Sequence, residues 1–334
     1  MKSLLLYLAL PVFAISAAHA QGQQAEAFLI YEEGDVERVW ITAATTAAIR
    51  YKETEQAVDT KDGKIDEIQS IYILEPPALT EAIELYQARK YTEAKDKLAA
   101  IKTAYEGIQE LPDNPSTNAA YLELECLRKS GDLDGLAKAV ETFDKAGLTR
   151  EFQLRQVELY AMWDAVRTKD WARLENICKE RLKERMPGFQ RAQIGYCLGL
   201  ALDSQDKLIP AINAYNIAMT ADTGASEDIT RTATLNSLRL YKKDTDVQTA
   251  IKLWGTPDEV PGSTGHQRLL EAAALTELYQ LSLGGGTPLP DEFKDLLKYV
   301  KKSEAAEPAE KEEPEKKEPE KKEPEKKEPE KKGK

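Results

Sequence analysis

Histidine and cysteine, the residues most often used for nucleophilic, acid–base and metal chemistry, are scarce in this chain. The 334 residues include two histidines and three cysteines. His19 lies in a segment that we expect to be removed, so His266 is the imidazole left for general base catalysis. Cys126, Cys178 and Cys197 have neither CxxC spacing nor a neighbouring histidine, and they therefore predict neither a zinc site nor a redox pair.

The other candidates for chemistry lack a complete motif. The 58 acidic residues place pairs such as Glu123 and Glu125 throughout the chain, so no pair indicates a glycosidase. The glycine run 284–286 lacks the lysine and hydroxyl residue of a phosphate-binding loop, and the acidic loop 244–246 lacks the glycine and distal glutamate of a calcium loop. We expect no enzyme, no cofactor and no metal site, and a secreted hydrolase is the least favoured alternative.

Residues 1–20 have the layout of a secretory signal peptide. Lys2 precedes an apolar stretch over residues 4–17, and the segment ends in Ala18-His19-Ala20 before Gln21. A membrane anchor is the alternative, but it needs about 20 apolar residues and this stretch is shorter and contains Pro11. No cysteine follows the expected cleavage site as a lipid acceptor. The sequence thus predicts a periplasmic or secreted protein without a transmembrane segment.

The net charge of -12 bears on the choice of partner. A strongly acidic chain repels a phosphate backbone, so nucleic acid is not expected as a ligand. A protein or peptide partner remains, with a component of the cell envelope as one candidate.

Residues 21–76 predict a small β module. Short alternating segments separated by turn residues indicate four or five strands in a barrel or sheet, and the stretch resembles SH3-like or Sm-like barrels. We expect this module to act as a packing platform for the helices that follow Pro76-Pro77. The expected strands span residues 28–32, 36–42, 46–53 and 68–74, with turns at 34–35 and 62–63.

Residues 77–302 predict paired amphipathic helices joined by short polar turns. The clearest unit has small and large apolar residues at Leu198, Gly199, Leu202, Leu208, Ala211, Tyr215 and Ala218. This unit resembles the tetratricopeptide (TPR) repeat of the exported bacterial type, which implies a mainly α fold built as an α-solenoid of helix hairpins. A generic helical array is the alternative. Equivalent turn positions recur every 37 to 42 residues, at Tyr91, Leu133, Trp171, Leu208 and Val247, and a closing pair is expected at 267–282 and 292–302.

The resemblance implies that the first helix of each pair lines a concave face that binds the partner. Basic and aromatic residues at the matching positions suit an acidic peptide. The alternative is that the basic residues complement helix dipoles at exposed helix ends. The candidate partner-binding residues are Tyr121, Arg128, Lys129, Trp163, Arg167, Tyr196, Arg239, Lys242 and Lys243.

Residues 303–334 repeat Glu-Pro-Glu-Lys-Lys and predict a disordered tail, because almost no apolar side chain is present to form a core. The composition resembles the Pro-Glu-Lys spacers of envelope proteins. The sequence therefore favours an exported, non-enzymatic interaction scaffold, with a structural envelope tether as the alternative. Cys178 and Cys197 fall in neighbouring helices of consecutive units, which allows either a disulfide or two buried free thiols.

Overall fold

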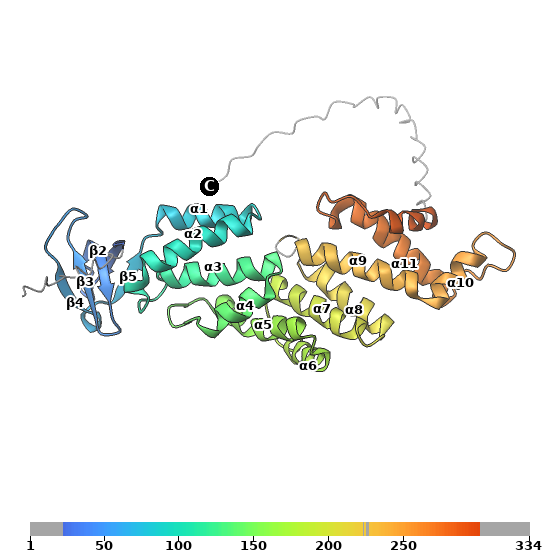
Figure 1. Cartoon of the computed structure of the whole chain (residues 1–334), viewed down its shortest axis with the longest axis horizontal. Coiled ribbons are helices and arrows are strands. Elements are labelled where there is room, and N and C mark those ends of the chain that lie inside the picture. The colour runs from blue at the N-terminus through green and yellow to red at the C-terminus, as the bar shows by residue number, and fades with distance from the viewer. Residues whose placement is uncertain (1–22, 223, 225–226, 301–334) are drawn as a thin grey trace, which may run out of the picture.

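The computed structural model describes residues 23–222, 224 and 227–300, without the side chain of Glu227. The expected signal peptide and tail lie outside these residues. The described chain is mainly helical, with an antiparallel sheet at one end of an elongated molecule and α11 near the other (Figure 1). None of its helices is long and apolar enough to cross a membrane.

Five antiparallel strands form the N-terminal sheet in the order β4-β3-β2-β1-β5. Alternate side chains of the central strands, such as Leu29, Val39 and Ile41, are fully buried, as expected for a sheet with one face on a core. The turn expected at 62–63 is wrong, because these residues pair with β3. The strands are β1 (Ala25–Ile30), β2 (Val36–Ala44), β3 (Ala48–Lys52), β4 (Lys61–Lys64) and β5 (Ser70–Ile73).

The sheet shares its core with the first helices. Leu98 and Ile101 of α2 and Ile108, in the turn that follows α2, belong to the same buried cluster as Leu29 and Ile41. The amide of Gln23 also donates a hydrogen bond to the carbonyl of Ala104 at 2.8 Å. The sheet therefore packs on the first helix pair.

The helices follow one another as consecutive pairs. Four of the five expected turn positions, Tyr91, Leu133, Trp171 and Leu208, are the first residues of second helices, and the fifth, Val247, lies two residues inside α10. The expected start after Pro76 is also confirmed. The pairs among the described residues are α1 (Pro77–Gln87) with α2 (Tyr91–Ala104), α3 (Pro115–Ser130) with α4 (Leu133–Glu141), α5 (Glu151–Thr168) with α6 (Trp171–Arg181), α7 (Gly188–Asp203) with α8 (Leu208–Ala221), and α9 (Glu227–Lys243) with α10 (Thr245–Leu253).

The first four pairs share one turn conformation. One residue of each turn has φ between +56° and +81°, and the amide of the next residue donates to the carbonyl five positions earlier over 2.9 to 3.0 Å. This is the Schellman ending of a helix, which satisfies carbonyls that the last turn leaves free. The turn before α10 differs, since Asp244 has φ −67°. The four left-handed residues are Arg89, Gly131, Lys169 and Asp206.

The C-terminal pair departs from expectation. α11 (Thr264–Leu278) runs into a π-helical turn (Tyr279–Leu283), and the second expected helix is a 3₁₀ segment, Asp291–Tyr299. Phe293 and Leu296 are both buried and lie three residues apart, which matches the three-residue turn of a 3₁₀ helix.

All three cysteines are free and buried, so the disulfide considered between Cys178 and Cys197 is not formed. Burial raises the pKa of both Cys126 and Cys178 to about 12. Because the thiolate is the reactive form of cysteine, these side chains act as small apolar groups in the core.

Candidate functional site

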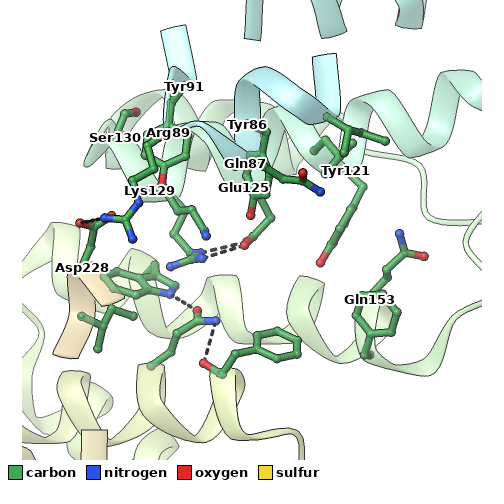
Figure 2. Close-up of a pocket in the computed structure, with 18 of the residues that line it drawn as sticks. Tyr86, Gln87, Arg89, Tyr91, Tyr121, Glu125, Lys129, Ser130, Gln153 and Asp228 are labelled. Atoms are coloured by element: carbon green, nitrogen blue, oxygen red, sulfur yellow. Dashed lines mark hydrogen bonds and ion pairs between the residues drawn. The ribbon is translucent and has the colours of Figure 1, made fainter. Parts of the chain in front are cut away.

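A cavity of about 810 Å³ lies on the first helices of the pairs, between the sheet end and the middle of the molecule. Its walls come from α1, α3, α5, α7 and α9, and its lining is rich in aromatic rings (Figure 2). Five candidate residues line it, namely Tyr121, Arg128, Lys129, Trp163 and Tyr196.

Distant parts of the chain meet at this cavity. Arg89, in the turn between α1 and α2, forms an ion pair with Asp228 at the start of α9, with Nη1 and Oδ1 3.1 Å apart. The two residues are 139 positions apart in the sequence and both line the cavity. The first and fifth helix pairs therefore meet across it.

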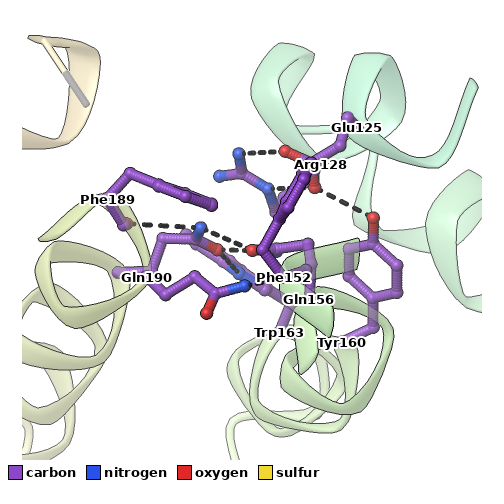
Figure 3. A network of polar contacts seen from close by, with 9 residues as sticks. Glu125, Arg128, Phe152, Gln156, Tyr160, Trp163, Phe189 and Gln190 are labelled. Carbon is purple, nitrogen blue, oxygen red and sulfur yellow. Dashed lines mark hydrogen bonds and ion pairs between the residues drawn. The ribbon is translucent and has the colours of Figure 1, made fainter. Parts of the chain in front are cut away.

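Arg128 is part of the framework of the cavity rather than a free cation. Its guanidinium makes two hydrogen bonds to Glu125, of 2.9 and 2.7 Å, and the hydroxyl of Tyr160 donates a third to the same carboxylate at 2.9 Å (Figure 3). Burial alone would raise the pKa of Glu125, but the charge and hydrogen bonds of Arg128, together with Tyr160, outweigh it, and the pKa lies below the usual range. Arg128 also lies over the ring of Trp163, 5.5 Å from its centre.

A buried amide network joins α5 to α7 beneath the cavity. The side chains of Gln156 and Gln193 exchange two hydrogen bonds, of 3.0 and 2.9 Å. The indole Nε1 of Trp163 donates to Gln193 Oε1 at 3.0 Å. These bonds fix the orientation of the Trp163 ring, since a buried polar group keeps the partner that satisfies it.

Lys129 differs from the other candidate cations. Its Nζ lies 4.8 Å from the ring centre of Tyr86 and 6.0 Å from that of Tyr91, and the side chain is half-buried. Burial and the neighbouring Arg128 lower its pKa. Within the described residues, no carboxylate lies within ion-pair distance of this ammonium group. A cation in that position has room for an anion supplied by a ligand.

The remaining candidate cations, Arg167, Arg239, Lys242 and Lys243, are not among the residues that line the cavity. Each of them forms an ion pair with a carboxylate, and none of these pairs was predicted from the sequence. Arg167 pairs with Asp164 at 2.8 Å, Arg239 with Asp203, Lys242 with Asp295 at 2.9 Å, and Lys243 with Asp206 at 2.7 Å.

Sequence reasoning missed two aromatic residues of the cavity, Phe152 and Phe189. Each is the second residue of its helix, and the two rings pack edge to face with centres 6.3 Å apart. They occupy equivalent positions in consecutive units, because they are separated by the same 37 residues as the left-handed turn residues Lys169 and Asp206. That repeat spacing is the signal that would have found them.

His266 lies away from this cavity. Its ring stacks on Trp254 with centres 5.2 Å apart, and its Nδ1 is 3.4 Å from Glu259. It lines a smaller cavity of about 380 Å³ formed by α10, α11 and the loop between them.

Comparison with protein-family models, with curated proteins and with solved structures found no match to this chain. The described residues contain no group of three or more His, Cys, Asp and Glu side chains that could hold a metal ion.

Proposed function

We propose that this protein is an exported interaction scaffold whose helix pairs form a TPR-like solenoid, and that an acidic peptide segment of its partner binds in the cavity. The observation that carries the proposal is Lys129, a half-buried cation in the cavity with no carboxylate of a described residue within ion-pair distance, Glu125 and Asp228 acting on it only from farther away. The other cations of the candidate set have a carboxylate within that distance. The ligand would supply the missing charge.

The lining supports a peptide as the ligand. Aromatic side chains supply apolar contact area with little loss of side-chain entropy, and buried aromatic anchors dominate many protein interfaces. Trp163 and Tyr196 lie with ring centres 6.3 Å apart, and the pair formed by Phe152 and Phe189 lines the same cavity. Apolar side chains of a peptide would pack here, while its carboxylate pairs with Lys129.

The repeated turn supports the solenoid. Four consecutive pairs use the same left-handed residue and the same hydrogen bond, so each pair can stack on the next in a similar way. The first helices then share one face, and the cavity lies on that face.

The test uses a random library of 12-residue peptides selected against the purified protein, with the recovered peptides measured by fluorescence anisotropy. We expect acidic peptides whose affinity falls with salt, and a loss of about tenfold or more in Lys129→Met. Lys243→Met is the matched control, because Lys243 is a paired lysine outside the cavity. Equal affinities for both variants, or no binding peptide, would contradict the proposal.

A further inference from the structure

The side-chain amide of Gln153 is buried without a hydrogen-bond partner among the described residues. Its side chain lines the cavity and is 5% exposed, and its Oε1 has no hydrogen-bond partner. No hydrogen bond from its Nε2 is present among the described residues either. Buried amides are normally paired, so an unpaired one in a cavity wall needs an explanation.

Gln156, one turn later on α5, shows how this protein satisfies a buried amide. Its Oε1 and Nε2 both bond to the carboxamide of Gln193, at 2.9 and 3.0 Å. Both glutamines are buried on the same helix. Gln190 holds the place on α7 that corresponds to Gln193, but its Nε2 donates to the carbonyl of Phe152 at 2.7 Å. Among the described residues no hydrogen bond joins it to Gln153, whose side chain borders the cavity.

A second unpaired group lies in the same wall. Tyr121 is 6% exposed and lines the cavity, and its hydroxyl makes no hydrogen bond to a described residue. Figure 2 shows Tyr121 and Gln153 on one side of the cavity, and Lys129, Arg89 and Asp228 on the other. The neutral hydrogen-bonding groups of Gln153 and Tyr121 thus lie across the cavity from Lys129 (Figure 2).

We propose that Gln153 binds an amide group of the ligand, with an N–H donated to its Oε1 and a carbonyl accepting from its Nε2 or from the Tyr121 hydroxyl. The inference rests on the proposed function and adds a second point of recognition, opposite Lys129. An extended peptide residue presents its own N–H and C=O along one edge, and the side chain of Asn or Gln offers the same two groups. Gln153 therefore selects for an amide at a set distance from the ligand carboxylate.

The unused amide is also expected to weaken the free protein. A buried polar group without a partner is unfavourable, and its replacement by an apolar side chain of similar size is neutral or stabilising. Methionine has nearly the shape of glutamine. Gln153→Met should leave the unfolding midpoint unchanged or raise it, which separates a ligand-binding role from a structural one.

The experiment is a double-mutant cycle with the tightest peptide recovered from the library described above. Each residue of that peptide is N-methylated in turn, and each Asn or Gln is replaced by Leu. We expect one of these changes to lower the affinity of the wild-type protein by about tenfold and to have no further effect on Gln153→Met. N-methylation identifies a main-chain amide, and the Leu replacement identifies a side-chain amide.

Gln267→Met serves as the control, because Gln267 is an exposed residue of α11 outside the cavity, and it should behave as the wild type. If the peptide binds and depends on Lys129, but no peptide change is coupled to Gln153, the inference is overturned and the proposed function stands. A marked fall in the unfolding midpoint of Gln153→Met would also overturn it, since the amide would then be structural. Failure of every peptide to bind overturns both.

Discussion

The first-helix face has two parts that carry similar charges and differ in structure. At the cavity, Lys129 lies over tyrosine rings with no carboxylate of a described residue within ion-pair distance. Arg128 forms a buried ion pair with Glu125. Towards the C-terminal ends of α7 and α9, Arg239 and Lys243 pair with acids on neighbouring units in the presence of solvent. Under the proposed function, a basic residue on this face would contact the ligand only where the neighbouring units leave it unpaired and partly desolvated.

The difference has a physical cause. An exposed ion pair contributes little, because water screens it and both side chains lose freedom. A buried pair cannot be separated without leaving a charge in a medium that solvates it poorly. An arginine in an exposed ion pair thus contributes little to the free energy of unfolding, whereas the buried Arg128 contributes much.

The largest effect is expected from breaking the buried pair. Arg128→Met leaves the carboxylate of Glu125 buried without its cation, and we expect a loss of about 3 to 5 kcal/mol in the free energy of unfolding. Urea denaturation followed by circular dichroism measures it. Arg239→Met, which breaks an exposed pair, should lose no more than about 1 kcal/mol. Equal losses would remove the distinction between the two parts of the face.

A second contrast, between a buried and an exposed carboxylate, is tested by pH. Hydrogen bonds from Lys179 and Gln205, followed by Lys207, lower the pKa of the buried Glu175 to about 2. A lowered folded-state pKa stabilises the protein fully above the unfolded value near 4.3, and this stabilisation is lost as the pH falls towards 2.

Thermal melts between pH 6 and pH 2.5 check this. Glu175→Gln should be less stable than the wild type at pH 6 and approach it at pH 2.5. Asp206→Asn is the control, since Lys243 lowers the pKa of Asp206 at an exposed site where solvent weakens the interaction. A constant difference between Glu175→Gln and the wild type across this range would contradict the assignment.

A smaller effect on folding is expected at Lys129. Lys129→Met removes the contacts with Tyr86 and Tyr91 but also removes a partly desolvated charge, and these changes oppose each other. We expect a change within about 1 kcal/mol in the free energy of unfolding, measured by urea denaturation, alongside the loss of peptide binding. A loss of unfolding free energy as large as that of Arg128→Met would show that Lys129, like Arg128, is needed for folding.

The smallest effect is expected at Lys243. This residue is exposed, and its pair with Asp206 joins the end of α9 to the turn between α7 and α8. Lys243→Met should change neither the melting temperature nor the affinity for an acidic peptide within experimental error. A clear loss of peptide affinity would extend the binding surface beyond the cavity and restore a longer groove.

Much of the helical architecture was predictable from the sequence, because the local spacing of apolar residues and polar turns indicates where paired helices form. The apolar repeat placed turns where α2, α4, α6 and α8 begin, and Pro76-Pro77 marked the end of the sheet module. The pair of Glu125 with Arg128 was also within reach, since residues three apart meet on a helix surface. Because Arg128 was considered only as a partner-binding residue or as a complement to the helix dipole, the pairing was not predicted.

Tertiary structure decided the rest. The Asp-Gly sequence at 62–63 is a turn signal by local chemistry, and only its pairing with β3 makes it a strand. Arg239 and Lys242 find carboxylates 36 and 53 residues away, on other elements, so their neutralisation depends on how neighbouring units are rotated. The cavity, Lys129 without an acid among the described residues, and the unpaired amide of Gln153 depend on the same rotation. The sequence determined which helices exist. Packing between units decided which of their polar and charged side chains have no partner, because no local sequence pattern encodes the geometry that brings two units together.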